Sequence, residues 1–303
     1  PAVERPKVRR RHEPQLIHAP APPHMIPSLP RPLWLRIATV VFVAAFLVFL
    51  FLPLATVAAF AFNDAAYPAP PWQGFTLDWY RQLALNAPLK QAALNSLIVA
   101  LVTTALSIAI GTGGAWLLHR HRFPGSRLIQ TLVAVPMVMP EILLGISLLV
   151  LFATAGVQLG FATVIIGHVT FSFPFVLVAV QARLRGMDPA LEEAALDLGC
   201  NRFDAFRLVT LPIIAPAVIS GWLLAFTLSL DDLVIASFVS GPSSTTLPIK
   251  IWSSVRLGVS PEINALSTMM IGIVTIGVIS ASLISKRNSV RAQKDAQAAE
   301  RSA

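Results

Sequence analysis

One polar stretch in the second half of the chain organises the sequence around it: Glu193–Gly199 (EAALDLG), nine further residues, and Val209–Pro212 (VTLP). Asp188 offers a side-chain acceptor for a helix N-terminus, and Pro189 suits the first helical position because no N–H donor is needed there. Gly199 stands where a helix commonly ends in a residue with positive φ. The pattern predicts a short polar helix that ends at this glycine.

A second short helix is expected directly after the glycine. Asn201, with Asp204 three residues later, forms a pattern typical of a capped helix start. The first helix carries apolar residues at helical spacing, namely Leu191, Ala194, Ala195 and Leu198. We expect the two helices, in a loop at about 186–212, to form a docking surface beyond the bilayer.

The composition excludes a soluble globular protein. Hydrophobic residues make up 55% of the chain, charged residues make up 13%, and the mean hydropathy is +0.70. Since about 20 apolar residues cross a bilayer as a helix, the long apolar runs predict six membrane spans. These lie roughly at 35–62, 91–118, 128–153, 161–184, 212–239 and 263–285. The predicted fold class is all-α, a polytopic membrane protein with six transmembrane helices in a single domain over 34–285.

Two of the six segments contain prolines that break helices. The third contains Pro136 and Pro140, and the fifth begins among Pro212 and Pro216. Proline removes a backbone donor, but neighbouring helices can satisfy the carbonyl groups that it frees. We therefore expect both segments to cross the bilayer in spite of the breaks.

Positive charges flank the predicted spans unequally. Nineteen Lys and Arg residues fall in the two tails and in the second and fourth connections, whereas four fall on the other side: Arg81, Lys90, Lys250 and Arg256. Because basic loops stay in the cytoplasm, both termini and the polar hairpin are expected there. The net charge of +8 is thus a topology signal. Nucleic-acid binding is not expected, because the charges do not gather on a folded domain.

The two terminal segments and the single cysteine have simple expected properties. Residues 1–33 are rich in Pro and Arg without periodicity, which is typical of a disordered tail. They lack the features of a cleaved secretion signal, so the first span is expected to act as an uncleaved anchor. Residues 286–303 are expected to form a cytoplasmic tail. Cys200 alone cannot form an internal disulfide, and no metal or other cofactor is predicted.

The polar stretch resembles the EAA loop of the membrane subunits of ABC importers, in which Glu-Ala-Ala, three residues, Gly, nine residues and Ile-x-Leu-Pro recur. Every fixed position matches except that Val209 stands in place of Ile. The resemblance implies a type I ABC importer permease fold and a coupling surface for a separate ATPase. The residues that match the motif are Glu193, Ala194, Ala195, Gly199, Leu211 and Pro212. The sequence has no Gly-x-x-x-x-Gly-Lys-Ser/Thr pattern for phosphate binding, so the chain is not expected to be an enzyme.

Four further stretches narrow the resemblance to the polyamine permeases, and within them to the putrescine branch: 136–141, 220–232, 238–242 followed by 246–248, and 253–265. The resemblance implies a multi-pass protein of the bacterial inner membrane that pairs with a related but different permease subunit. It also implies two copies of an ATPase and a periplasmic polyamine-binding protein that delivers the substrate.

Acidic residues inside the predicted spans indicate a path for a cationic substrate. Carboxylates at membrane depth are costly and tend to face a bundle interior or a water-filled path, which makes Glu141, Asp231 and Asp232 candidates. Adjacent helix residues point about 100° apart. One aspartate is therefore expected to face the path, while the other caps a helix or pairs locally. Trp222 could stack on an alkyl-ammonium chain, although ordinary helix packing explains it more simply.

Several alternatives stay open. The acidic residues could pair only with Lys250, Arg256 or a sibling subunit, and His168 could relay protons or simply pack. The cargo of the same machine could be spermidine or ferric iron, whereas acids without basic residues inside the spans argue against an oxyanion. An ion-coupled secondary carrier would use Glu141 and Asp231 as proton sites, but it would leave the docking hairpin without a purpose. A third alternative, a purely structural membrane scaffold, would transport no substrate.

Overall fold

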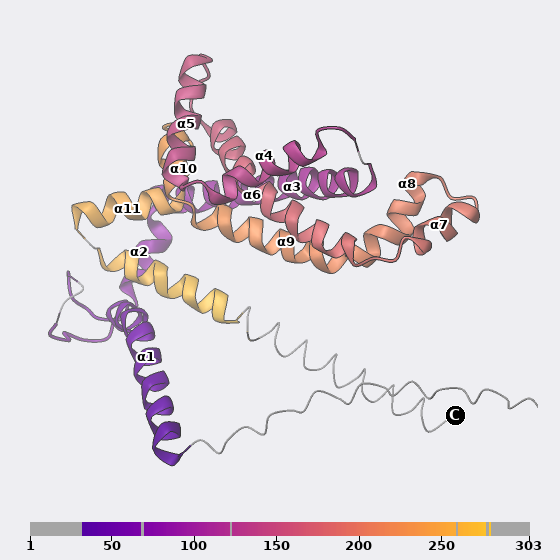
Figure 1. Cartoon of the computed structure of the whole chain (residues 1–303). Coiled ribbons are helices and arrows are strands. Elements are labelled where there is room, and N and C mark those ends of the chain that lie inside the picture. Colours follow the sequence, from indigo (N-terminus) through magenta and orange to yellow (C-terminus); the bar gives the residue numbers. More distant parts are fainter. Residues whose placement is uncertain (1–31, 68–69, 122, 259, 277–278, 280–303) are drawn as a thin grey trace, which may run out of the picture. The chain divides into compact units, whose positions relative to one another are not determined.

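The computed structural model describes residues 32–67, 70–121, 123–258, 260–276 and 279. Contacts divide the chain into two units, 1–54 and 55–303. The regular structure of the described residues is helical, and the single β interaction among them is an isolated bridge between Asn63 and Phe75 (Figure 1). The described part of the chain therefore has the predicted all-α class.

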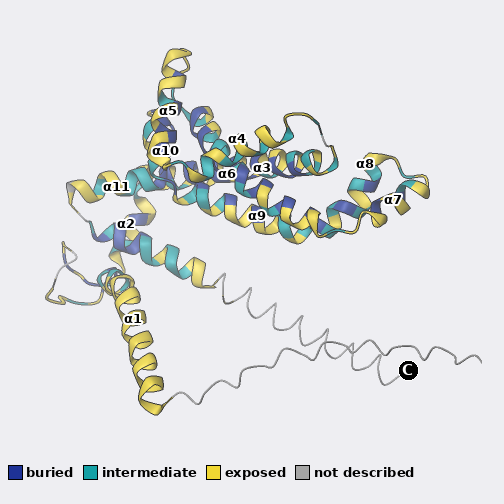
Figure 2. Cartoon of the chain, viewed as in Figure 1, coloured by how far each residue is buried: buried dark blue, intermediate teal, exposed yellow. Residues whose placement is uncertain are grey.

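The first unit contains most of helix α1 (Leu33–Phe60). This helix is apolar on all sides, and none of its side chains is buried (Figure 2). A helix that is hydrophobic all round and unburied has the surface of a lipid-facing membrane span. It agrees with the first predicted span to within two residues at each end.

Three long helices form the centre of the second unit. They are α3 (Ala87–Arg120), α6 (Phe161–Arg185) and α9 (Leu211–Asp231), and they pack more extensively against one another than other helices do. The close approach of α3 and α6 depends on Gly111, because a Cβ atom there would lie 2.8 Å from the side chain of Val176. Small residues allow this backbone contact between membrane helices.

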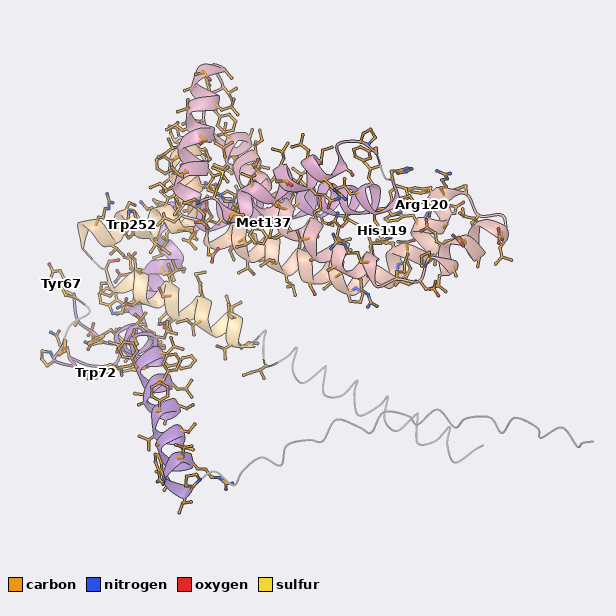
Figure 3. The ribbon with its side chains drawn as sticks, in the orientation of Figure 1. Tyr67, Trp72, His119, Arg120, Met137 and Trp252 are labelled. Atoms are coloured by element: carbon orange, nitrogen blue, oxygen red, sulfur yellow. The ribbon has the colours of Figure 1, made fainter. Side chains whose placement is uncertain are left out.

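The third predicted span is not a single helix. It consists of α4 (Ser126–Val138) and α5 (Glu141–Thr154), whose axes differ by 110°. Pro140 causes the break, because the residue before a proline is driven out of the α region. Met139 accordingly has an extended conformation with φ −73° and ψ 139°. Figure 3 labels Met137, which lies close to this bend.

The fifth predicted span, 212–239, is wrong at both ends. Helical structure begins at Arg202 with α8 (Arg202–Ala205), continues through the π-helical turn η1 (Phe206–Thr210) and runs to the end of α9. The wide turn arises where Pro212 has no N–H for an α-helical bond to the Leu208 carbonyl. At the other end, Asp232 is extended, and a separate helix, α10 (Val234–Val239), follows it.

Shorter helices complete the second unit. A buried apolar cluster joins α3 to α2 (Asp78–Leu85), α11 (Leu247–Leu257) and a helix over Pro261–Ile276. Only part of the predicted sixth span, 263–285, lies within the described residues. Four described helices are long and apolar enough to cross a membrane, or five spans if the bent pair counts as one. The count of six spans thus stays a prediction, and the predicted tails lie outside the described residues except for 32–33.

Candidate functional site

The predicted polar helix is present as α7 (Ala190–Asp197). The Asp188 carboxylate accepts a hydrogen bond of 3.0 Å from the first N–H of the helix. Gly199 follows the helix with φ +91°. Two backbone hydrogen bonds of 3.0 and 3.1 Å close the turn around this glycine in the pattern of a Schellman motif. The glycine stop is confirmed, and Asp188 accepts at the helix start as expected, but the first helical residue is Ala190 and Pro189 takes the capping position before it.

Of the apolar stripe predicted on α7, only Ala195 faces the core of this chain. Leu191 and Leu198 are 49% and 87% exposed, whereas Ala195 and the carboxylate-bearing Glu192 are buried. Glu193, Ala194 and Gly199 of the motif are also exposed. The exposed side of α7 thus carries Leu191 and Leu198 together with the acidic Glu193 and Asp197, whereas Glu192 and Ala195 face inward. Two large apolar side chains on the solvent side of a short helix indicate a contact surface.

The inward face of α7 is held by an ion pair that the sequence did not reveal. Oε1 of Glu192 lies 2.8 Å from Nη1 of Arg120, the last residue of α3. Figure 3 labels Arg120 and His119 at this end of α3, beside the region of α7 and α8. The two partners are far apart in the sequence, and neither has a spacing that would have indicated the pair.

The second short helix has the predicted cap, but it is not separate from the span that follows it. Asn201 Oδ1 accepts a hydrogen bond of 2.8 Å from the N–H of Asp204, and Asn201 Nδ2 donates one of 2.6 Å to the Asp204 carboxylate. The helix then runs on into α9 without a break. Leu211 is half-buried and Pro212 exposed, at the point where the π-helical turn ends and α9 begins.

Three carboxylates gather at two helix breaks. Glu141 is the first residue of α5, directly after the 110° bend, and Asp231 is the last residue of α9. Asp232 links α9 to α10. Glu141 is near enough to both aspartates to interact with them electrostatically. Sequence positions roughly ninety residues apart are thus brought together by folding.

The two aspartates have different surroundings. Asp232 is buried, and its carboxylate accepts hydrogen bonds of 3.2 and 2.8 Å from the N–H groups of Ile235 and Ala236 at the start of α10. Asp231 is exposed and lines a largely apolar cavity of about 610 Å³ with Phe226 and Trp252 among its neighbours. One carboxylate therefore caps a helix, while the other is open to a cavity.

A buried histidine completes the environment of Asp232. His168 Nε2 lies 2.9 Å from Asp232 Oδ2, and His168 Nδ1 lies 2.8 Å from the Ser229 hydroxyl. The three residue types are those of a hydrolase triad, but the space that they enclose has no room for another molecule. The group therefore fastens α6 to the junction of α9 and α10. The sequence placed His168 in the fourth span but gave no sign of its partners.

The basic residues considered as partners for the acids are placed elsewhere. Among the residues that the structure describes, Lys250 and Arg256 form no ion pair with Glu141 or Asp231. The Arg256 guanidinium instead lies 5.0 Å from the ring centre of Trp252.

Trp222 is not next to the carboxylates. Its ring stacks on that of Phe226, with centroids 5.3 Å apart and planes 6° from parallel, and the residue is 40% exposed. It lies nine residues before Asp231, a rise of about 13 Å along the helix. Only Phe226 of this pair reaches the cavity that Asp231 lines.

Comparison with known proteins identifies the class. The chain belongs to the family described as the binding-protein-dependent transport system inner membrane component, whose pattern matches residues 105–293. It is 43% identical to the spermidine/putrescine transport system permease protein PotC of Escherichia coli K12, over 81% of this chain and 92% of that protein. It is 42% identical to the putrescine transport system permease protein PotI of the same strain, over 84% of this chain and 92% of that protein.

A solved structure supports the fold. A bacterial ABC transporter involved in the import of the acidic polysaccharide alginate superposes with a TM-score of 0.68, covering 84% of this chain and 96% of that chain at 15% identity. The fold is that of a type I ABC importer permease, as the sequence resemblance implied. The two relatives are similar to this chain to almost the same degree, so the expected leaning toward the putrescine branch is not resolved.

Proposed function

We propose that this chain is a permease subunit of an ATP-driven polyamine importer that carries putrescine and forms half of the translocation path. The observation that carries the proposal is the meeting of Glu141, Asp231 and Asp232 at two helix breaks. Transporters commonly bind substrates where spanning helices are discontinuous. Charge-assisted hydrogen bonds from ammonium groups to carboxylates are stronger than neutral ones.

The cavity beside Asp231 suits the rest of such a substrate. A polyamine alternates ammonium groups with short methylene chains, so it needs an anionic contact and an apolar wall close together. Asp231 offers the first, and Phe226 and Leu230 are among the side chains that offer the second. Glu141 and Asp231 are proposed to face the path, and Asp232 to hold the break in shape. The contribution of Trp222 would be indirect, through its contact with Phe226.

The exposed apolar face of α7 is proposed to dock on a separate ATPase. Leu191 and Leu198 are exposed there, and a rigid helix in a cleft can pass a nucleotide-driven movement to the spans attached to it. The proposed assembly has a related permease, two ATPase subunits and a periplasmic binding protein. Both termini and α7 are proposed to lie in the cytoplasm, in agreement with the distribution of Lys and Arg.

Reconstitution tests the proposal. The chain would be placed in proteoliposomes with its partner permease, ATPase and binding protein, and uptake of radiolabelled putrescine would be measured with and without internal ATP. We expect uptake that requires ATP and survives an uncoupler, with spermidine as a competitor to rank the two cargoes. Uptake abolished by the uncoupler but indifferent to ATP would instead identify an ion-coupled carrier.

A further inference from the structure

A polar cavity of about 630 Å³ lies at the ends of α3, α4 and α6, apart from the carboxylates discussed above. Its size falls within the range of small-molecule sites. Its walls are His119 at the end of α3, His121 directly after that helix, Arg127 and Gln130 from the start of α4, and Gln181 and Arg185 from α6. Among the described residues that line it there is no carboxylate.

The donors in this cavity have no partner within the described chain. Gln181 is only 8% exposed, yet its amide makes no hydrogen bond with another described residue. The side chains of Arg127 and Arg185 likewise form no ion pair there. The Gln181 amide is thus open to the cavity, and a largely buried residue whose polar group faces a cavity without a protein partner is available to a ligand or to water. Gln181 and Arg185 share one face of α6, four residues apart, so both can reach the same ligand.

The N-terminus of α4 adds to the positive potential. Its N-cap is Gly125, so no side chain caps the first N–H groups, and its first turn contains no acidic residue. An uncapped helix N-terminus carries a partial positive charge and favours anions. Two arginines, two histidines and this helix end thus surround one cavity, and the described residues around it supply no negative charge.

We propose that this cavity binds a phosphate group, carried by an anionic phospholipid or free in the cytoplasm. Guanidinium groups match the geometry of phosphate oxygens, and basic pockets between membrane helices on the cytoplasmic side bind acidic headgroups. The cytoplasmic position rests on the proposed topology. Leu128 and Leu132 of α4 are 62% and 58% exposed close to the cavity, where they can contact the acyl chains of a lipid.

The site adjoins the coupling helix. Arg120 lies between the two cavity histidines in the sequence and pairs with Glu192 of α7. A bound phosphate would therefore order the end of α3 that holds α7, and it would reduce the repulsion among the cavity's positive charges. This gives the lipid or phosphate a route to the coupling segment that does not involve the transported cargo.

The test uses the full-length chain in the assembled importer, delipidated in detergent and without polyamine, so its outcome is independent of the cargo. The thermal unfolding midpoint is followed during titration with phosphatidylglycerol, phosphatidylcholine or inorganic phosphate. We expect a saturable rise with phosphatidylglycerol that phosphatidylcholine does not give. A rise with inorganic phosphate alone would also support the site and would identify free phosphate as its ligand.

Variants connect the effect to the cavity. Arg127→Ala/Arg185→Ala is expected to weaken the apparent affinity at least about tenfold, since two charge-assisted contacts are lost. Gln181→Glu preserves the side-chain shape and should have a similar effect by placing a carboxylate in the cavity. Arg36→Ala removes an arginine outside the cavity and is the matched control. If the double variant does not assemble, Gln181→Glu decides the outcome.

Three results would overturn the proposal. The first is a phosphatidylglycerol response no greater than that of phosphatidylcholine, together with no response to inorganic phosphate. The second is an unchanged affinity in Gln181→Glu, or an equal loss in Arg36→Ala. The third is protection of a cysteine at position 127 by the ATPase subunit with no protection by lipid or phosphate, which would make the cavity a protein interface.

Discussion

The guanidinium of Arg120 and the carboxylate of Glu192 lie 2.8 Å apart and tie the end of α3 to the helix that carries the exposed apolar face. The Glu192 side chain is 7% exposed and that of Arg120 is 26% exposed. Removing one partner from a largely desolvated pair leaves the other charge unpaired, and this is more damaging than replacing both.

We therefore expect Arg120→Ala and Glu192→Ala each to lower ATP-driven uptake while the protein still reaches the membrane. The double variant should be less impaired than the sum of the two, with a coupling energy on the order of 0.5–3 kcal/mol. Thermal unfolding midpoints and uptake rates of all four proteins measure this. If the effects of the two single variants simply added in the double variant, the ion pair would contribute nothing to stability or uptake.

Gly199 should tolerate a residue chosen for its backbone preference rather than its size. A Cβ atom there would meet nothing within 4 Å, so φ +91° is the constraint. Asn adopts positive φ more readily than other non-glycine residues. We expect Gly199→Asn to keep most uptake, and Gly199→Arg to abolish it without preventing membrane insertion. Equal uptake by the two variants would show that the turn at Gly199 has no part in coupling to the ATPase.

The two neighbouring aspartates should separate stability from transport. Asp232→Asn weakens the contact with His168 and the cap of α10, and a buried group left unsatisfied costs about 1–3 kcal/mol. Its thermal midpoint and its abundance in the membrane should fall. Asp231→Asn, which changes a group without these contacts, should leave both near wild type and reduce uptake. The reverse pattern would contradict the assignment of Asp231 to the path.

Glu141→Gln tests the carboxylate at the bend with little change of shape. Losing a charge-assisted contact with an ammonium group should reduce transport efficiency roughly tenfold, because about 1.4 kcal/mol corresponds to a factor of ten. ATPase activity stimulated by the loaded binding protein should survive better than uptake. Wild-type putrescine uptake by both Glu141→Gln and Asp231→Asn would end the case for an acidic path.

Labelling tests the proposed topology. After Cys200→Ser, a cysteine introduced at Gln158 should react with an impermeant maleimide from outside. One introduced at Ser126 should react only once the membrane is opened. Gln158 lies between α5 and α6, whereas Ser126 begins α4, so the two report on opposite ends of one segment. An inverted pattern would move α7 away from the cytoplasm.

Local chemistry explains what the sequence predicted well. The acceptor at Asp188, the glycine at 199 and the Asn201 cap act within a few residues, so their structures follow from short-range rules. Pro140 was recognised as a helix breaker, but the 110° bend depends on the helices packed around it. The end of α9 was missed because the apolar sequence continues past it. The break arises where the Asp232 carboxylate accepts hydrogen bonds from the first N–H groups of the next helix, α10.

Long-range pairs could not be found in the same way. His168 meets Ser229 and Asp232, and Arg120 meets Glu192, only because α3, α6 and α9 pack together. No periodicity in one sequence indicates such partners. The outward direction of Leu191 and Leu198 was not specified by the sequence, since a helical stripe does not reveal which side faces the protein's own core.

The helix from Arg202 to Asp231 has a mechanical consequence. Helical structure continues through the π-helical turn, and its 30 residues extend about 45 Å at 1.5 Å per residue. One end of this helix follows the turn at Gly199, and the other end carries Asp231, which lines the largely apolar cavity. We expect a tilt imposed at the first end to be passed to the second, and Trp116 of α3 packs on Phe206 close to the first end, where it would resist sideways displacement of the helix.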